Sequence, residues 1–203
     1  MKQRIIYLIL SLAMVLAIAS TAKTAHPIKM RAPIHTATTP PEASITQTTS
    51  EAPRNVQEFT PINIPLDAET QQYAYEQSKA NGIPVDLTIS VIWQESGYRP
   101  NLISKTEDYG LMQVNECNLL KVQQELGITN IFDPKQNIKA GTYILGACIR
   151  DYPTINQALM VYKEGSTGAP RLWKRGITSI KYTREIDAKR DQINKMIEEV
   201  MKE

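Results

Sequence analysis

The sequence predicts a mostly α-helical domain of the α+β class, in which a small loop and β-hairpin region interrupts a series of helices. Two observations predict it. Helix start and stop signals recur from Pro65 onward, whereas the stretch from Tyr98 to Asn115 carries Pro and Gly without helical spacing. The chain has 203 residues, 42% of them hydrophobic, which suffices for one ordinary core but not two. We therefore expect one folded domain over residues 65–203.

Capping residues mark the ends of the expected helices. Asp67 is placed to cap a helix that ends before Gly82, and Asp86 to cap a helix that ends before Gly97. Later helices are expected over residues 116–126, over residues 134–150 with Asp133 as the cap, over residues 155–165 with Thr154 as the cap, and over residues 179–203. The hairpin region would then lie beside the helix that ends at Gly97.

The first 22 residues have the layout of an export signal. Basic residues precede an uncharged, mostly apolar run that starts at Ile5. Ala17 and Ala19 fit a small-residue cleavage site, yet the run would reach about 27 Å as a helix, close to the hydrocarbon thickness of a bilayer. Cleavage and retention as a membrane anchor both stay open. We expect a protein exported to the cell envelope or beyond, secreted or anchored, that meets a membrane only through this segment.

Residues 23–64 are rich in Thr, Pro, Ala and Ser and show no periodicity, which predicts a disordered linker. The chain has two cysteines, Cys117 and Cys148. In an exported protein this even count permits one disulfide. The alternative is two buried free thiols, which behave as small apolar side chains.

Composition excludes several classes of function. The formal net charge of +2 argues against a dedicated nucleic-acid binder. The only histidines, His26 and His35, lie in the linker, so neither a histidine-rich metal site nor a histidine general base is expected. The sequence has no Gly-x-Ser-x-Gly, His-Glu-x-x-His or phosphate-binding loop. We expect a monomer that uses neither metal nor cofactor.

Glu95 is the candidate catalytic acid. It follows the apolar residues 91–93 and stands in the last turn of its expected helix. Partial burial and the negative end of the helix dipole both disfavour a charged carboxylate, so both raise its pKa. A glutamate that keeps its proton near neutral pH can act as a general acid. Taken alone, this pattern also fits an ordinary solvated or paired glutamate.

Three motifs around Glu95 resemble the lysozyme-like lytic transglycosylases of the soluble-transglycosylase (SLT) domain family. Residues 95–101 (ESGYRPN) resemble that family's catalytic Glu-Ser segment, and residues 108–115 (DYGLMQVN) its Gly-Leu-Met-Gln signature. Residues 132–145 resemble the helix that follows. The resemblance implies a lysozyme-like domain that acts on peptidoglycan glycan strands, at the β-1,4 bond between N-acetylmuramic acid and N-acetylglucosamine.

The resemblance also implies a mechanism. Glu95 would protonate the glycosidic oxygen with help from the substrate's acetamido group, and would then take the proton of the muramyl 6-hydroxyl. The ring closes to a 1,6-anhydro product, and no second carboxylate is required. Residues 107–115 also look like the stretch of chicken-type lysozymes that carries their second carboxylate, so Asp108 leaves a hydrolytic lysozyme (muramidase) as an alternative. Asp108 could equally be a turn residue that caps backbone groups before Gly110.

The same motifs supply candidate substrate contacts. The amides of Gln113 and Asn115 suit sugar hydroxyl and acetamido groups, and Met112 would form an apolar wall. Strand pairing and core packing are the alternatives for these residues. Ser96 would either orient Glu95 or cap the helix.

The sequence departs from the family at residues 160–165 (MVYKEG), where the family usually has Ala-Tyr-Asn-x-Gly. Tyr162 matches, and the resemblance implies that it lines the cleft or hydrogen-bonds near Glu95. Lys163 replaces the Asn and removes a sugar contact. Tyr182 resembles a late family tyrosine that closes the cleft.

The altered motif leaves one further alternative, a catalytically weak glycan-binding or scaffold domain. The small size of the chain is similar to that of specialised enzymes that open local gaps in the wall. A secretion or conjugation apparatus is therefore a candidate partner.

Overall fold

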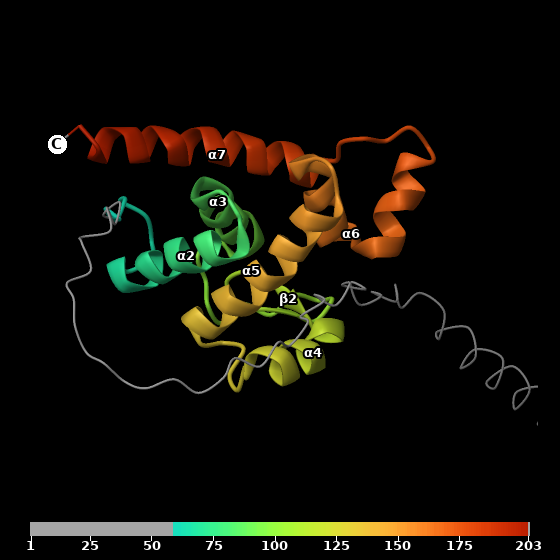
Figure 1. The fold of residues 1–203 in the computed structure, drawn as a ribbon, viewed down its shortest axis with the longest axis horizontal. Coiled ribbons are helices and arrows are strands. Elements are labelled where there is room, and N and C mark those ends of the chain that lie inside the picture. Colours follow the sequence, from blue (N-terminus) through green and yellow to red (C-terminus); the bar gives the residue numbers. More distant parts are fainter. Residues whose placement is uncertain (1–58, 203) are drawn as a thin grey trace, which may run out of the picture.

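The computed structural model describes residues 59–202, and Figure 1 shows their arrangement. The expected export segment and most of the expected linker lie outside the described residues. The predicted class is confirmed, because helices dominate and one two-stranded antiparallel hairpin interrupts them. The elements are α2 (Ala68–Asn81), α3 (Val85–Ser96), β1 (Asp108–Tyr109), β2 (Val114–Asn115), α4 (Glu116–Leu126), α5 (Pro134–Asp151), α6 (Ile155–Trp173) and α7 (Lys181–Val200).

Most of the predicted helix starts are confirmed, and one is wrong. Asp67 and Asp133 cap α2 and α5, each accepting a hydrogen bond from the backbone N–H three residues later. Asp86 does not cap α3, because Pro84 holds that position. The Asp86 carboxylate lies instead in the first turn of α3 and pairs with Arg190 of α7, whose Nε is 2.7 Å from it.

Helix α6 does not end at Gly165, as the sequence predicts, but bends there. Gly165 has a φ of 74° and a ψ of 167°, outside the helical range, and helical backbone resumes after it up to Trp173. A positive φ costs glycine little, which allows the bend at this residue. In Figure 1 the two arms of α6 run in different directions, so the outer arm extends away from the helical core.

Helix α3 lies in the middle of the core. Leu87, Val91 and Ile92 are fully buried, as are Ile186 and Ile193 on α7, and α7 lies along α3 in Figure 1. Burial of each such side chain contributes about 1.5–3 kcal/mol. This packing explains why the apolar run of α3 has no polar face, and it holds the C-terminal end of α3 in a defined place.

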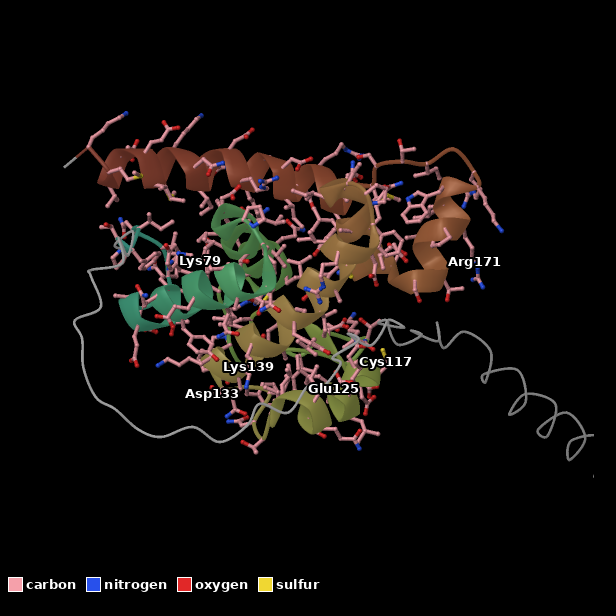
Figure 2. The ribbon with its side chains drawn as sticks, in the orientation of Figure 1. Lys79, Cys117, Glu125, Asp133, Lys139 and Arg171 are labelled. Carbon is pink, nitrogen blue, oxygen red and sulfur yellow. The ribbon has the colours of Figure 1, made fainter. Side chains whose placement is uncertain are left out.

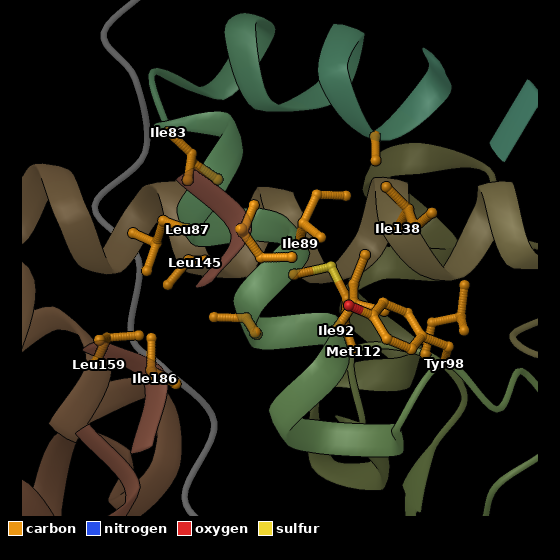
Figure 3. Packing of buried hydrophobic residues seen from close by; sticks show 14 of the residues in the cluster. Ile83, Leu87, Ile89, Ile92, Tyr98, Met112, Ile138, Leu145, Leu159 and Ile186 are labelled. Carbon is orange, nitrogen blue, oxygen red and sulfur yellow. The ribbon is translucent and has the colours of Figure 1, made fainter. Parts of the chain in front are cut away.

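Figure 3 shows this core from close by. The labelled side chains come from segments far apart in the sequence and point toward one another; they include Ile83, Leu87, Leu145, Leu159 and Ile186. The end of the segment that the sequence predicts as linker, residues 62–64, also packs against this core. Ile62 is buried, and its backbone N–H and C=O both bond the side-chain amide of Gln71 on α2.

The hairpin is fixed to α5 by one buried side chain, Asn137. Its Nδ2 donates to the carbonyls of Tyr109 and Ile131 at 2.8 and 2.9 Å, and its Oδ1 accepts from the Met112 N–H at 2.8 Å. Gly110, with a φ of 74°, passes so close that a Cβ there would clash with the Asn137 amide. The Asn137 amide therefore sets the position of the hairpin relative to the helices.

Within residues 59–202, no helix is both long enough and apolar enough to cross a membrane.

Candidate active site

Glu95 stands in the last turn of α3, where the chain leaves the core. Gly97 ends the helix in a left-handed conformation and donates to the Trp93 carbonyl. Two adjoining pockets meet at Glu95 and share the residues around it, so a long substrate can extend to either side of the carboxyl. The residues that line both pockets are Glu95, Thr106, Asp108, Gln113 and Lys163.

Each carboxyl oxygen of Glu95 has one partner. The Tyr182 hydroxyl, from α7, donates to Oε1 at 2.6 Å. The Lys163 ammonium, from α6, lies 3.4 Å from Oε2 and 5.1 Å from the centroid of the Tyr182 ring. The Glu95 side chain is only 6% exposed, whereas that of Lys163 is 42% exposed. The structure therefore brings together a buried carboxyl, a phenol and a half-exposed cation.

The surroundings of Glu95 favour its protonated form. Burial raises the pKa of Glu95 above its ordinary value and outweighs Lys163 and the Tyr182 hydrogen bond, which lower it. The charge of Asp108 adds a smaller upward contribution. Burial also holds the pKa of Tyr182 well above its usual range, so its hydroxyl stays a neutral donor. A carboxyl of this kind can give up a proton and take one back.

Asp108 lies across the cleft from Glu95 on β1, in a different setting. The hydroxyls of Ser104 and Thr106 each donate to its Oδ2 at 2.6 Å, and the amide of Asn115 donates to its Oδ1 at 2.7 Å. Asn115 is also its partner in the strand register. Both carboxylate oxygens are thus used to hold the hairpin together, although Asp108 does line the cleft.

Gln113 and Asn115 reach the cleft, but both support the hairpin. The Gln113 amide donates to the carbonyls of Gly110 and Leu102 at 2.9 and 3.2 Å. The Asn115 Oδ1 accepts from the Cys117 N–H and caps α4. Gln113 borders both pockets and Asn115 borders the first, and their contact with substrate stays a prediction.

Tyr162 lines the first pocket, as expected, and its hydroxyl donates to the Met112 carbonyl at 2.8 Å. Burial raises the pKa of Tyr162 well above its usual range. Lys163 was missed as a partner of Glu95, because the sequence shows only a departure from a family asparagine. Its place beside Tyr162, in a motif already assigned to the cleft, was the signal that could have found it.

Comparison with known proteins identifies the family. The Transglycosylase SLT domain family matches residues 72–179, which is more than half of the chain. The chain belongs to this family. A curated protein named Transglycosylase, from Enterobacteria phage PRD1, is 34% identical to this SLT domain protein over 83 residues, 41% of this chain and 30% of the phage protein.

A second relative, the membrane-bound lytic murein transglycosylase C of Pectobacterium atrosepticum, is 31% identical over 97 residues, 43% of this chain and 27% of that protein. The chain thus matches under a third of the length of either relative.

Two solved structures have similar backbones. An inactive mutant of lytic transglycosylase Slt from Pseudomonas aeruginosa gives a TM-score of 0.49 at 16% identity, covering 61% of this chain and 22% of that one. The 70 kDa soluble lytic transglycosylase of Escherichia coli gives a TM-score of 0.48 at 19% sequence identity. The match covers 63% of this chain and 22% of that one.

Two residues expected to contact substrate do not reach the cleft of this SLT domain. Met112 is fully buried in the core, where its side chain packs against Gly141, so it cannot form the apolar wall. The Ser96 hydroxyl is 99% buried and donates to the Ile92 carbonyl at 3.1 Å. Ser96 therefore satisfies its own helix and does not orient Glu95.

Both cysteines of the SLT domain are free, so the disulfide alternative is not formed. Cys148 is buried in the core, where burial raises the pKa of its thiol to about 12. Cys117, half-buried at the start of α4, lines the first pocket with Arg171, and Figure 2 labels both. Within residues 59–202 no cluster of three or more His, Cys, Asp or Glu side chains is placed to hold a metal ion.

Proposed function

We propose that this SLT domain is a peptidoglycan lytic transglycosylase. It cleaves the β-1,4 bond between N-acetylmuramic acid and N-acetylglucosamine and forms a 1,6-anhydromuramyl product. Family membership supports the reaction class. The observation that carries the proposal is the Glu95 side chain, which is 6% exposed where two pockets meet and accepts a hydrogen bond on one carboxyl oxygen from a neutral tyrosine.

In the first step Glu95 acts as a general acid. Tyr182 occupies Oε1, so the proton on Oε2 is the one transferred to the glycosidic oxygen. The bond from that oxygen to the muramyl anomeric carbon breaks, and N-acetylglucosamine leaves with a free 4-hydroxyl. The carbonyl oxygen of the muramyl acetamido group attacks the anomeric carbon as the bond breaks, which is a substrate-assisted route that needs no enzyme nucleophile.

In the second step Glu95, now a carboxylate, acts as a general base. It removes the proton of the muramyl 6-hydroxyl, whose oxygen attacks the anomeric carbon and displaces the acetamido oxygen. The sugar closes to the 1,6-anhydro form, and Glu95 ends protonated as it began. Burial of the Glu95 carboxyl supports this cycle, since it raises the pKa of Glu95 and so brings the energies of the acid and the carboxylate closer together at pH values above the ordinary glutamate pKa.

The surroundings of Asp108 favour this reaction over hydrolysis. A second catalytic carboxylate must be free to approach the anomeric carbon or a bound water. Asp108 accepts three hydrogen bonds from its own hairpin. We therefore do not assign it a covalent role.

The test is the chemistry of the new chain ends. Purified glycan strands digested with the wild-type protein are expected to release fragments with 1,6-anhydromuramyl ends, each one water lighter than a reducing end. The Glu95→Gln protein is the control and should release few fragments. Reducing ends alone would assign a muramidase, and strand binding without release would assign a scaffold.

We further propose that the enzyme works in the cell envelope. The layout of the first 22 residues supports export, and one relative is named as membrane-bound. Fractionation of cells that express the full chain, with detection by antibody, tests this location. Pull-down from envelope fractions of the native host tests a secretion or conjugation apparatus as partner.

A further inference from the structure

Lys163 occupies the approach to the catalytic oxygen. Its ammonium lies 3.4 Å from Oε2 of Glu95, and Tyr182 is already bonded to Oε1. Oε2 is therefore the oxygen that must face the glycosidic bond. A lysine ammonium has only donors and no acceptor, so it cannot receive and relay the proton of Glu95. In the position seen, the Lys163 ammonium lies in the cleft beside the oxygen that would face the glycosidic bond.

The remaining contacts of Lys163 suit a side chain that can move. Its ammonium lies over the Tyr182 ring at 5.1 Å from the centroid, and the side chain is 42% exposed. The four-carbon stem is flexible, and the ammonium is strongly hydrated in water. Lys163 lies two residues before the bend of α6 at Gly165, and it lines both pockets.

We propose that Lys163 is a positioning residue that holds Oε2 of Glu95 in the free enzyme and swings toward solvent before the carboxyl protonates the glycosidic oxygen. The inference rests on the function proposed above. After the first step Glu95 is a carboxylate, and the ammonium returns to stabilise it while the anhydro ring forms. The lysine thus opposes the acid step and supports the base step, which distinguishes it from a neutral asparagine at the same place.

Other charged and titratable groups around Glu95 do not duplicate this cation. From α6, Tyr162 is neutral, and from α7 Tyr182 is a neutral donor to Oε1. Asp108 on β1 adds a negative charge. Lys181 and Glu185 of α7 line the second pocket as a pair, with Nζ and Oε1 3.5 Å apart. Without Lys163, burial and the charge of Asp108 still raise the pKa of Glu95, and mainly the Tyr182 hydrogen bond lowers it. Glu95 should therefore keep its proton to higher pH.

The experiment compares pH profiles of kcat/KM, each normalised to its own maximum. Lys163→Met and Lys163→Asn should move the alkaline limb up by about one pH unit, because a cation this close lowers a carboxyl pKa by about 1–3 units and the exposed ammonium acts at the low end. Relative activity on the wild-type alkaline limb should then rise about tenfold. Lys163→Arg should keep the wild-type limb. Lys121→Met is the matched control, because Lys121 pairs with Glu125 at 3.5 Å and lines neither pocket.

An alkaline limb at the wild-type pH in both neutral variants would overturn the proposal, as would a Lys163→Arg limb that moves with them. A second readout does not depend on turnover. NMR titration of carbon-13-labelled glutamate side chains should show Glu95 ionising at higher pH in Lys163→Met than in wild type, and equal titration curves would again overturn it. If the wild-type protein releases no fragments, the proposed function fails while this titration still tests the contact.

Discussion

Two carboxylates face the same cleft from two regions built in different ways. Glu95 ends the buried helix α3 and has one partner on each oxygen, a neutral phenol and a half-exposed lysine. Asp108 lies in the hairpin and accepts from two hydroxyls and one amide, all from residues within seven positions in the sequence. At the helix end, Oε2 of Glu95 has a partner that can move away, the Lys163 ammonium. In the hairpin, both carboxylate oxygens of Asp108 accept hydrogen bonds that stabilise the hairpin itself.

The difference shows how one cleft can assign different roles to the same chemical group. Burial in the apolar helix core raises the pKa of Glu95, which prepares it for proton transfer. Local donors that surround Asp108 are typical of a carboxylate that organises a turn. We therefore propose that the chemistry takes place at the helix end and that the hairpin supports the structure of the cleft.

Replacement of the acid should have the largest effect. Glu95→Gln keeps the size of the side chain and can still accept from Tyr182, but it has no acidic proton. We expect the rate of fragment release from purified peptidoglycan to fall about 10²–10⁴-fold, the range typical for loss of a general acid or base. Circular dichroism checks that the protein is folded. A folded variant that clears peptidoglycan at the wild-type rate would remove Glu95 from the mechanism.

The anchor of the hairpin should show the next largest effect, on stability. Asn137→Ala leaves the part-buried carbonyls of Tyr109 and Ile131 and the buried Met112 N–H without their side-chain partner. We expect a loss of about 3 kcal/mol in the free energy of unfolding, measured by denaturant titration. Asn63→Ala, at an exposed asparagine before α2, is the control and should change it by less than about 0.5 kcal/mol. If Asn137→Ala lowers the free energy of unfolding no more than the control does, other contacts hold the hairpin in place.

The phenol beside Glu95 should matter less than the acid. Tyr182→Phe removes the hydrogen bond to Oε1 without changing the packing of the ring. A hydrogen bond to the carboxylate that forms as Glu95 gives up its proton contributes about 1.5–3 kcal/mol, so kcat/KM should fall about 10- to 150-fold. Tyr75→Phe, at a half-buried tyrosine of α2 that lines neither pocket, is the comparison. Equal activity in Tyr182→Phe and wild type would show that the hydroxyl does not position the carboxyl.

Asp108→Asn should have a smaller effect on activity and tests the comparison directly. The hydroxyls of Ser104 and Thr106 can rotate to accept from the new amide, so the hairpin should survive. We expect less than a tenfold loss of kcat/KM, as for the removal of a distant charge. A loss above about a hundredfold in a protein with the wild-type melting temperature would assign Asp108 a catalytic role and favour the two-carboxylate mechanism.

The smallest expected effect is on the pH dependence of melting. The pKa of Glu95 is raised in the folded state, so its stabilising contribution is complete below the ordinary glutamate pKa and is lost as pH rises through the folded value. Glutamine does not titrate. The melting temperature of Glu95→Gln should therefore rise relative to that of wild type as the pH rises above the ordinary glutamate pKa of about 4.3. The control is Glu198→Gln, at an exposed glutamate of α7, which should show no such trend. A difference that stays constant with pH would contradict the raised pKa.

Local features of the fold could be predicted from the sequence. The caps of α2 and α5 and the glycine that ends α3 depend on neighbouring residues, and the sequence identifies them correctly. Asp86 was a wrong cap because its partner, Arg190, lies 104 residues away. Contacts of that kind are decided by the packing of α3 against α7, which no local pattern encodes.

The candidate site divides in the same way. The position of Glu95 at an apolar helix end is visible in the sequence, but its partners Lys163 and Tyr182 are 68 and 87 residues away. Met112 was misplaced because the hairpin turns that side chain toward Gly141 of α5, which allows it to pack in the core. Ser96 was misplaced because a helical serine can bond the carbonyl one turn back, which the Ile92 carbonyl accepts.

The most direct test of the single-carboxylate account is digestion of purified glycan strands in heavy-oxygen water, with mass analysis of the new muramyl ends. A hydrolase adds one solvent oxygen at each cleaved bond, whereas ring closure by the 6-hydroxyl adds none. We predict 1,6-anhydromuramyl ends that carry no heavy oxygen. Reducing muramyl ends that each carry one heavy oxygen would contradict the account.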